Sequence, residues 1–372
     1  MDKTNALSLR GGGMFDGGWS PTWLIRDEFT DTLAAGSVNG TAATPGPGTR
    51  SVTDTESKLS VSSGALAIAG GKASPAWGDP GLWMNGINRI TGVGAISKIV
   101  APAGAVRFVF GFSQSTSGEP SLPNPCVYLY NGTIYGTQSN INMGAYSAGQ
   151  DYVFAIILRS TGAFVVAAGG AFSSATLLWV YGSGTTATLY PCAVNYNATS
   201  SVDYLRALAL PAPFDTDTGL ATDVHAGSVS AGTTFSHEAD CLIEFTATTV
   251  PSGDSIDVQF RKQDATNFWT CRINSSGDIA LIETVAGSET SRGSAAGVVS
   301  SGHRVVIIAD GTTIRGYSNN VLRWTYASAT NFATATAGEL DALGTGGAVS
   351  DLITWPRTLS GTAASILNKA SA

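Results

Sequence analysis

Hydrophobic and polar residues alternate along most of the chain in short runs. A period of two is typical of strands that bury one face and expose the other. Asn-Gly, Ser-Gly-Asp and Asp-Gly sequences, which favour tight turns, separate several of these runs at 131–132, 276–278 and 310–311. The predicted strands include 106–112, 126–130, 152–158, 241–247, 256–260, 269–273 and 304–309. We therefore predict an all-β protein, with a single helix after Ser360.

The order of these landmarks occurs twice along the chain. In each half, a hairpin turn is followed by a central strand, a Trp-x-Tyr sequence and a late strand that opens with Asp. The paired landmarks are Trp179 with Trp324 and Asp203 with Asp351. We interpret this order as a duplicated domain with a junction at the Pro-Ala-Pro sequence 211–213, and predict domains at 27–210 and 214–372.

Residues 1–26 form a leader that has neither a strand period nor a helix period. It carries many large apolar side chains, among them Phe15, Trp19 and Trp23. Burying one such side chain is worth roughly 1.5–3 kcal/mol, so the leader is expected to dock on a protein surface. We predict an assembly arm that binds sister subunits and other proteins of a particle. The alternative is that these anchors fold back on the first domain.

Composition and charge argue against some classes of binding partner. Charged residues make up 13% of the chain, the net charge is −7, and Lys and Arg do not cluster, which argues against nucleic-acid binding. No apolar run is long enough for a membrane-spanning helix, and no secretory signal is visible, so membrane insertion is not expected. The four cysteines lack CxxC spacing and are predicted to be buried thiols.

The landmarks resemble the concanavalin A-like lectin/glucanase superfamily, which includes laminin G-like domains. The sequence DEFTD at 27–31 is similar to the first strand of that family, VDYLR at 202–206 to its closing strand, and WPRTLS at 355–360 to the end of many members. The resemblance implies two tandem antiparallel jelly-roll β-sandwiches. The Gly-rich leader ahead of tandem lectin-like domains also resembles bacteriophage virion appendage proteins.

The glucanases of this superfamily hydrolyse β-glucans with a Glu-x-Asp-x-Glu or Glu-x-Asp-x-x-Glu strand. The nearest match here is Glu238, Asp240 and Glu244, in which the last Glu comes one position too late. A retaining pair needs carboxyl groups about 5–5.5 Å apart. We therefore predict no catalytic residues and no enzyme activity. The three histidines are isolated along the chain and are expected at the surface: His225, His237 and His303.

Aromatic side chains are the remaining candidates for ligand contacts, because sugar rings stack on Tyr and Trp. Tyr128 and Tyr130 share one face of a predicted strand, and neither they nor Tyr135 have aromatic equivalents in the second repeat. These three residues form the predicted carbohydrate-binding site. Some family members hold Ca²⁺ near the first and last strands, so the resemblance implies Asp27 and Asp203 as candidate ligands. No other cofactor is expected.

Together, these features predict a non-enzymatic structural and adhesion protein on the surface of a phage-like virion. It would be a homo-oligomeric decoration, spike or tail-fibre component, made in the host cytoplasm, that binds cell-surface polysaccharide. One alternative is a free, secreted or cell-surface lectin-like module of a bacterial protein. A glycoside hydrolase is a further alternative, although no convergent acid/base pair is evident.

Overall fold

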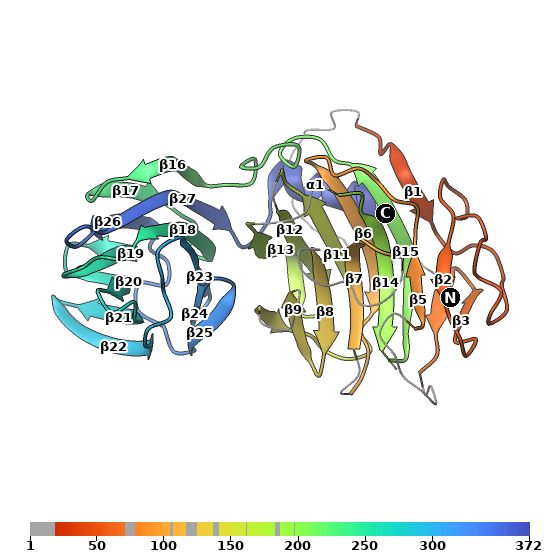
Figure 1. Ribbon diagram of the computed structural model, residues 1–372, viewed down its shortest axis with the longest axis horizontal. Helices are drawn as coiled ribbons and strands as arrows, with labels where there is room; N and C mark the ends of the chain where they lie inside the picture. Colours follow the sequence, from red (N-terminus) through yellow and green to blue (C-terminus); the bar gives the residue numbers. More distant parts are fainter. Residues whose placement is uncertain are drawn as a thin grey trace. The chain divides into compact units, whose positions relative to one another are not determined.

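A computed structural model describes residues 19–70, 79–104, 107–116, 125–136, 141–160, 162–182, 187–196 and 198–372 (Figure 1). The chain divides into two units: the first comprises Met1–Gly219 and Thr358–Ala372, and the second comprises Leu220–Arg357. Each unit consists of two antiparallel sheets, which confirms the predicted all-β class and the sandwich architecture. Among the described residues, no helix is long and apolar enough to cross a membrane.

The first unit contains sheets 1A and 1B. Sheet 1A has the strand order β13 (Phe172–Tyr181), β12 (Ala163–Gly169), β11 (Asp151–Leu158), β6 (Val93–Val100), β15 (Ser200–Ala209), β4 (Ala65–Ile68), β3 (Leu59–Ser62). Strand β1 (Trp23–Asp27) also pairs with β15, outside this order. Sheet 1B has the order β10 (Asn142–Ala145), β9 (Thr133–Gly136), β8 (Cys126–Tyr130), β7 (Arg107–Ser113), β14 (Tyr190–Tyr196), β5 (Gly81–Trp83), β2 (Ser51–Thr53).

The second unit contains sheets 2A and 2B. Sheet 2A has the order β16 (Asp223–Val229), β27 (Ala348–Pro356), β18 (Cys241–Thr249), β23 (His303–Asp310), β24 (Thr313–Ser318), β25 (Val321–Tyr326). Sheet 2B has the order β17 (Thr233–Ser236), β26 (Ala337–Ala342), β19 (Ser255–Asp264), β20 (Asn267–Asn274), β21 (Ile279–Val285), β22 (Ser288–Ala295).

The two units share one topology. The order β13-β12-β11-β6-β15-β1 of sheet 1A matches β25-β24-β23-β18-β27-β16 of sheet 2A. The order β10-β9-β8-β7-β14-β5 of sheet 1B likewise matches β22-β21-β20-β19-β26-β17 of sheet 2B. The repeated landmarks fall on equivalent strands, because Trp179 and Trp324 lie on β13 and β25 and Asp203 and Asp351 lie on β15 and β27. The repeated sequence landmarks therefore lie on equivalent strands of the two units.

The end of the chain belongs to the first unit, whereas the sequence-based boundary of 214–372 assigns it to the second domain. Helix α1 (Gly361–Ser371) begins after Ser360, as predicted, and buries its Ile366 and Leu367 side chains. The Arg206 guanidinium donates to the Ala370 carbonyl at 3.0 Å. This contact joins residues far apart in sequence, so local spacing does not reveal it. The second unit is therefore an insertion between β15 and α1.

The predicted arm of residues 1–26 includes a strand of the first sandwich. Trp23 lies on β1, which pairs with β15, and its neighbour Ile25 is only 1% exposed. The guanidinium groups of Arg26 and Arg206 lie 5.4 and 5.3 Å from the centre of the Trp23 ring. For Trp23, the folded-back alternative is therefore correct. Trp19 is partly buried ahead of β1, and Phe15 lies outside the described residues.

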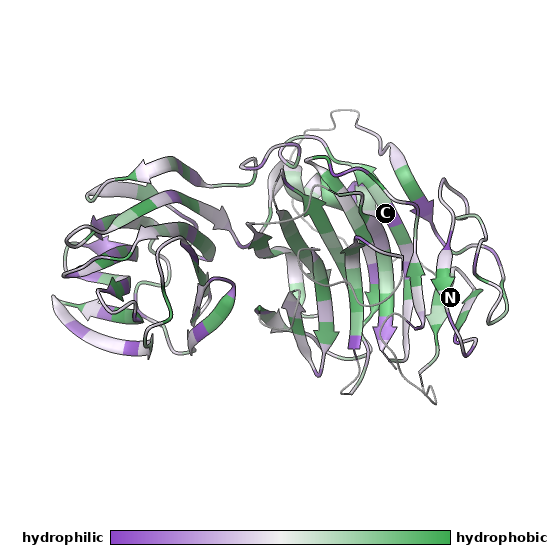
Figure 2. Cartoon of the chain, viewed as in Figure 1, coloured by the Kyte–Doolittle hydropathy of each residue, from purple (hydrophilic) through white to green (hydrophobic). Residues whose placement is uncertain are grey.

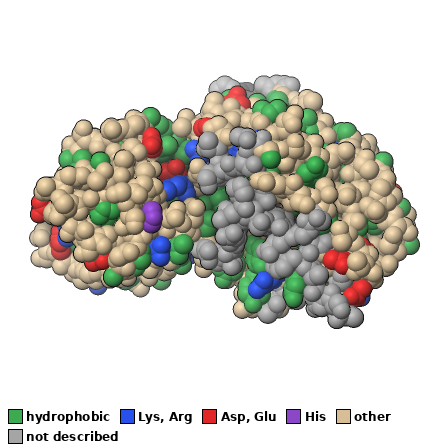
Figure 3. All heavy atoms as spheres, in the orientation of Figure 1, with side chains coloured by type: hydrophobic (Ala, Val, Ile, Leu, Met, Phe, Trp, Pro, Cys, Tyr) green, Lys and Arg blue, Asp and Glu red, His purple; other side chains and the backbone are tan. Residues whose placement is uncertain are grey.

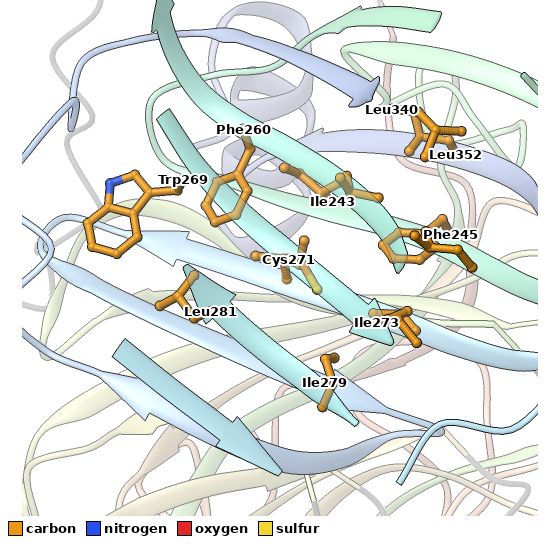
Figure 4. Close-up of a cluster of buried hydrophobic side chains, with 14 of the residues drawn as sticks. Ile243, Phe245, Phe260, Trp269, Cys271, Ile273, Ile279, Leu281, Leu340 and Leu352 are labelled. Carbon is orange, nitrogen blue, oxygen red and sulfur yellow. The ribbon is translucent and has the colours of Figure 1, made fainter. Parts of the chain in front are cut away.

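Apolar side chains between the sheets form the core of each unit, and the strands carry most of the hydrophobic positions (Figure 2). In the second unit, Ile243 and Phe245 of β18 lie over residues of sheet 2B, including Phe260 and Cys271 (Figure 4). Strand β18 thus buries the face that its alternation predicts. The four cysteines are all buried free thiols, as predicted: Cys126, Cys192, Cys241 and Cys271.

Candidate ligand-binding surfaces

The three predicted carbohydrate-binding tyrosines lie together on the outer face of sheet 1B. Tyr128 on β8 is directly opposite Tyr135 on β9, and Tyr130 is opposite Arg107 on β7. The Arg107 guanidinium lies 5.9 and 5.0 Å from the ring centres of Tyr128 and Tyr130. Tyr128 is only 4% exposed, whereas Tyr130 and Tyr135 are partly exposed. Of the three rings, Tyr128 therefore offers little surface for stacking.

The equivalent sheet of the second unit has a polar outer face. Core residues of β19 alternate with Asp257 and Gln259, and core residues of β20 alternate with Thr270 and Arg272. Gln259 and Thr270 are directly opposite each other, as are Asp257 and Arg272. We call this surface the network face. It is formed by Asp257, Gln259, Thr270, Arg272, Thr284 and Glu289.

An ion-pair network spans the network face. The Arg272 guanidinium donates to both oxygens of Asp257, with a shortest distance of 2.7 Å, and to both oxygens of Glu289 at 2.8 and 2.9 Å. Glu289 lies on β22, so the side chains meet across the intervening strand β21. Hydrogen bonds with Glu289 and Asp257 raise the pKa of Arg272, and the Arg272 hydrogen bonds lower the pKa of Glu289. The network therefore stays charged near neutral pH.

Among the described residues, two buried polar atoms of this face have no hydrogen-bond partner. They are Gln259 Oε1 and Thr284 Oγ1, whose residues are 6% and 3% exposed. An unsatisfied buried polar group costs about 1–3 kcal/mol, which favours a small side-chain movement that admits a water or a ligand hydroxyl. Phe268 lies directly opposite Thr284 and adds a partly exposed ring. The face thus combines charged groups, unpaired polar atoms and one aromatic side chain.

The network face was not predicted, because its side chains are neither aromatic nor spaced as catalytic acids. The alternation that identifies this face was nevertheless present in the segments IDVQF at 256–260 and WTCRI at 269–273. In both segments polar side chains with several hydrogen-bonding atoms occupy the positions between core residues. Strand alternation alone identifies such a face, but only the pairing of β19 with β20 shows that the two sets are adjacent.

The glucanase-like acidic residues have separate partners. Glu244 accepts a hydrogen bond from Arg304 at 2.6 Å, and its neighbour Ile243 faces the core, as the alternation predicts. Asp240 accepts the Gly311 backbone N–H at 2.8 Å. Glu238 is exposed. The Glu244 and Asp240 carboxylates thus anchor an arginine side chain and a turn.

One of the three histidine predictions is wrong, because His237 is buried. Its exposed fraction is 2%, and the Arg261 backbone N–H donates to Nε2 at 3.0 Å. His237 Nδ1 lies 2.7 Å from the Glu238 carbonyl oxygen, which fits a proton on Nδ1. Burial lowers the pKa of His237, so the neutral ring is favoured. His225 and His303 are partly exposed.

The two predicted Ca²⁺ ligands are each paired with a basic side chain. The Arg50 guanidinium donates to the two oxygens of Asp27 at 2.6 and 2.7 Å, and both residues are fully buried. Lys98 Nζ lies 2.8 Å from Asp203 Oδ2. In the described part of the chain, no three His, Cys, Asp or Glu side chains gather as a metal site. These positively charged partners lie where a cation would have to bind, so the residues do not fit Ca²⁺.

Charged side chains are sparse on the face of the molecule drawn in Figure 3. Basic and acidic groups of the described residues occur there beside one another, without an extended basic area. This distribution agrees with the low charged fraction of 13%.

No protein-family model matches the chain, and no curated protein matches it. Solved structures show a distant similarity. The carbohydrate-binding module CBM66 from Bacillus subtilis is 12% identical, with 34% of this chain and 84% of that chain covered and a TM-score of 0.27. Galectin LEC-6 from Caenorhabditis elegans is 10% identical, with 34% and 92% covered and a TM-score of 0.28. SCLam, a family GH16 endo-β-1,3(4)-glucanase, is 11% identical, with 50% and 90% covered and a TM-score of 0.35.

Proposed function

We propose that this chain is a non-enzymatic adhesion protein whose second unit binds glycans on the network face. The observation that carries the proposal is the pair of unpaired buried polar atoms, Gln259 Oε1 and Thr284 Oγ1, beside the Arg272 network. A sugar hydroxyl both donates and accepts hydrogen bonds. A small side-chain rotation that opens the buried Gln259 Oε1 lets one hydroxyl donate to it while a neighbouring hydroxyl accepts from Arg272, and a ring C–H face can contact Phe268.

The test is a glycan array probed with the full chain and with the Gln259→Leu variant. Replacing an unpaired buried amide oxygen by an apolar group of similar size leaves folding stability nearly unchanged, because no internal hydrogen bond is lost. Glycan binding is expected to fall about tenfold or more, because the ligand loses its acceptor. Equal binding by the wild type and Gln259→Leu, at equal melting temperature, would contradict the proposal.

Tyr130 and Tyr135 on sheet 1B remain a second candidate surface, because both rings are partly exposed and lie on adjacent strands. The matched variant for this surface is Tyr130→Ala. Loss of array binding in Tyr130→Ala, with Gln259→Leu unaffected, would move the glycan site to the first unit. A single stacked ring binds weakly, so the multimerised protein is the appropriate probe.

The proposal also places the protein on the surface of a phage-like virion, as a decoration, spike or tail-fibre component that binds cell-surface polysaccharide. The support is the apolar leader of the sequence, which holds Leu7, Leu9 and Phe15 ahead of the first sandwich. Deleting residues 1–18 leaves β1 intact. The truncated protein is expected to keep its melting temperature and to lose oligomerisation or particle attachment. A lower melting temperature with unchanged assembly would show that the leader stabilises the first unit.

The competing function is a glycoside hydrolase. Its support would be turnover of β-glucan by the wild type that disappears in Glu238→Gln or Glu244→Gln. We expect no turnover, because Arg304 and the Gly311 turn engage Glu244 and Asp240. Activity abolished by either substitution would replace the adhesion proposal by an enzymatic one.

A further inference from the structure

A cleft of about 690 Å³ lies between the C-terminal helix α1 and the outer face of sheet 1A. We call it the helix cleft. Its volume is within the range of about 300–1,000 Å³ that is typical of small-molecule sites. Lys98, Asp151 and Tyr204 line it from the sheet, and Asn368 and Lys369 line it from the helix. All of these residues belong to the first unit.

An ordered trio of charged groups lies at the helix cleft. Lys98 Nζ lies 2.9 Å from Asp151 Oδ2 and 2.8 Å from Asp203 Oδ2. Lys98 and Asp151 both line the cleft and are 31% and 54% exposed, so a ligand can reach both side chains. Burial alone would lower the pKa of Lys98, but the hydrogen bonds with Asp203 and Asp151 raise it. The cleft therefore presents an ammonium donor, held in place by Asp203, beside the Asp151 carboxylate acceptor.

Neighbouring residues also hold the Tyr204 side chain that lines the cleft. Tyr204 is directly opposite Lys98 on the neighbouring strand, and the Arg206 guanidinium lies 4.0 Å from the Tyr204 ring centre. Gly169 and Gly170 form the turn after β12, and a side chain at Gly170 would collide with the ring of Tyr152. This wall of the cleft therefore carries no side chain.

We propose that the helix cleft is a second binding site, which takes a neutral saccharide of one to three rings. Carboxylate acceptors and ammonium donors alternate around it, and each hydroxyl of a saccharide can satisfy one of each kind. A metal cation would be repelled by Lys98 and Lys369, which outnumber the one acidic side chain of the lining, Asp151. The site goes beyond the proposed function, because it lies in the first unit and on the sheet opposite the three tyrosines.

The test is saturation-transfer NMR of the full chain with cellotriose, maltotriose and chitotriose as separate probes. Asp151→Asn combined with Asn368→Ala removes polar groups that are at least partly exposed, so the fold is expected to persist. Affinity for the best trisaccharide should fall about tenfold or more in this variant, because two hydrogen-bonding groups are weakened. Asp341→Asn, an exposed Asp of the second unit, is the matched control and should bind as the wild type does.

The same measurement on Gln259→Leu separates this site from the network face. The proposal predicts that trisaccharide binding at the helix cleft survives Gln259→Leu, even if the network face binds nothing. Three results would overturn it: no saturation transfer to any of the three probes, unchanged affinity in the Asp151→Asn and Asn368→Ala variant, or loss of all transfer in Gln259→Leu alone.

Discussion

At the scale of single residues, a buried ion pair stabilises the first unit. Asp27 and Arg50 are both fully buried, and Arg50 also donates to Asp31 at 2.7 Å. Asp27 Oδ1 in addition accepts the backbone N–H of Phe29 at 3.1 Å. These hydrogen bonds tie β1 to the following loop. Such a pair gains little over an apolar replacement, but removing one partner leaves an uncompensated buried charge.

We expect Asp27→Ala to lower the free energy of unfolding of the first unit by about 3–5 kcal/mol. The physical reason is that the buried Arg50 guanidinium loses both hydrogen bonds to Asp27 and keeps those to Asp31, Thr41 and Thr44. Urea denaturation is the measurement. Lys262→Met breaks a partly exposed pair with Glu339 and serves as the control, with an expected loss of about 0–1 kcal/mol. Equal losses in the two variants would refute the argument from burial.

A second ion pair makes the first unit sensitive to acid. Burial alone would raise the pKa of Glu28, but hydrogen bonds and charge from Arg206 and Arg26 lower it below the ordinary value of 4.5. A carboxyl group with a lowered folded-state pKa stabilises the fold at pH values above its unfolded-state pKa. This stabilisation is lost as the pH falls from the unfolded-state pKa to the folded-state pKa. We expect stability to decrease below about pH 4.5. Glu28→Gln should flatten this part of the pH profile, and an unchanged profile would show that other groups dominate.

At the scale of elements, helix α1 covers apolar residues of sheet 1A. Ile96 of β6, Val153 of β11 and Ala168 of β12 line a small cavity together with Leu367 of the helix. Strand β1 completes the same sheet by pairing with β15. Strand β1 and helix α1, from opposite ends of the described chain, are therefore both part of the first unit.

We expect Leu367→Ala to destabilise the first unit by about 2–5 kcal/mol, because it deletes buried methyl groups over the sheet. Hydrogen exchange followed by mass spectrometry locates the effect. Amide protection should decrease in β6 and β11 and remain unchanged in β18 and β23 of the second unit. Loss of protection confined to the second unit would contradict the assignment of α1 to the first.

At the scale of the whole molecule, the chain consists of two sandwich units with equivalent strand orders, and the second unit is inserted in the sequence of the first. The first unit needs residues from both sides of Leu220–Arg357. The two units differ in the chemistry of equivalent sheets. Sheet 1B presents Tyr128 and Tyr130 on β8, whereas sheet 2B presents Thr270 and Arg272 on the equivalent strand β20.

This architecture predicts different outcomes for two truncated chains. A chain that ends at Gly219 lacks α1, and we expect it to aggregate or to melt earlier because an apolar face of sheet 1A is exposed. A chain in which a flexible Gly-Ser linker replaces Leu220–Arg357 keeps α1 and should fold without aggregating. Thermal melting and size-exclusion chromatography compare the two. Equal behaviour would mean that α1 contributes nothing to the first unit.

The alternation of polar and apolar residues was sufficient to predict the all-β class, strand β8 at its observed bounds and the terminal helix after Ser360. These features depend on contacts between neighbours in sequence and on which face of a strand is apolar, and both are visible in a linear pattern. The same pattern placed Ile243 in the core and Glu244 opposite to it.

The tertiary structure was needed to show that α1 belongs to the first unit and that Asp203 pairs with Lys98 rather than with a metal. It was also needed to show that His237 is buried and that Arg272 forms an ion-pair network. Each of these depends on partners that are distant in sequence, or on how much of a side chain its neighbours cover. Alternation predicts which face of a strand a residue occupies. It does not predict which strand is the neighbour in the sheet or which side chains cover the residue, because the neighbour and the covering side chains depend on sheet order and on packing of the whole chain.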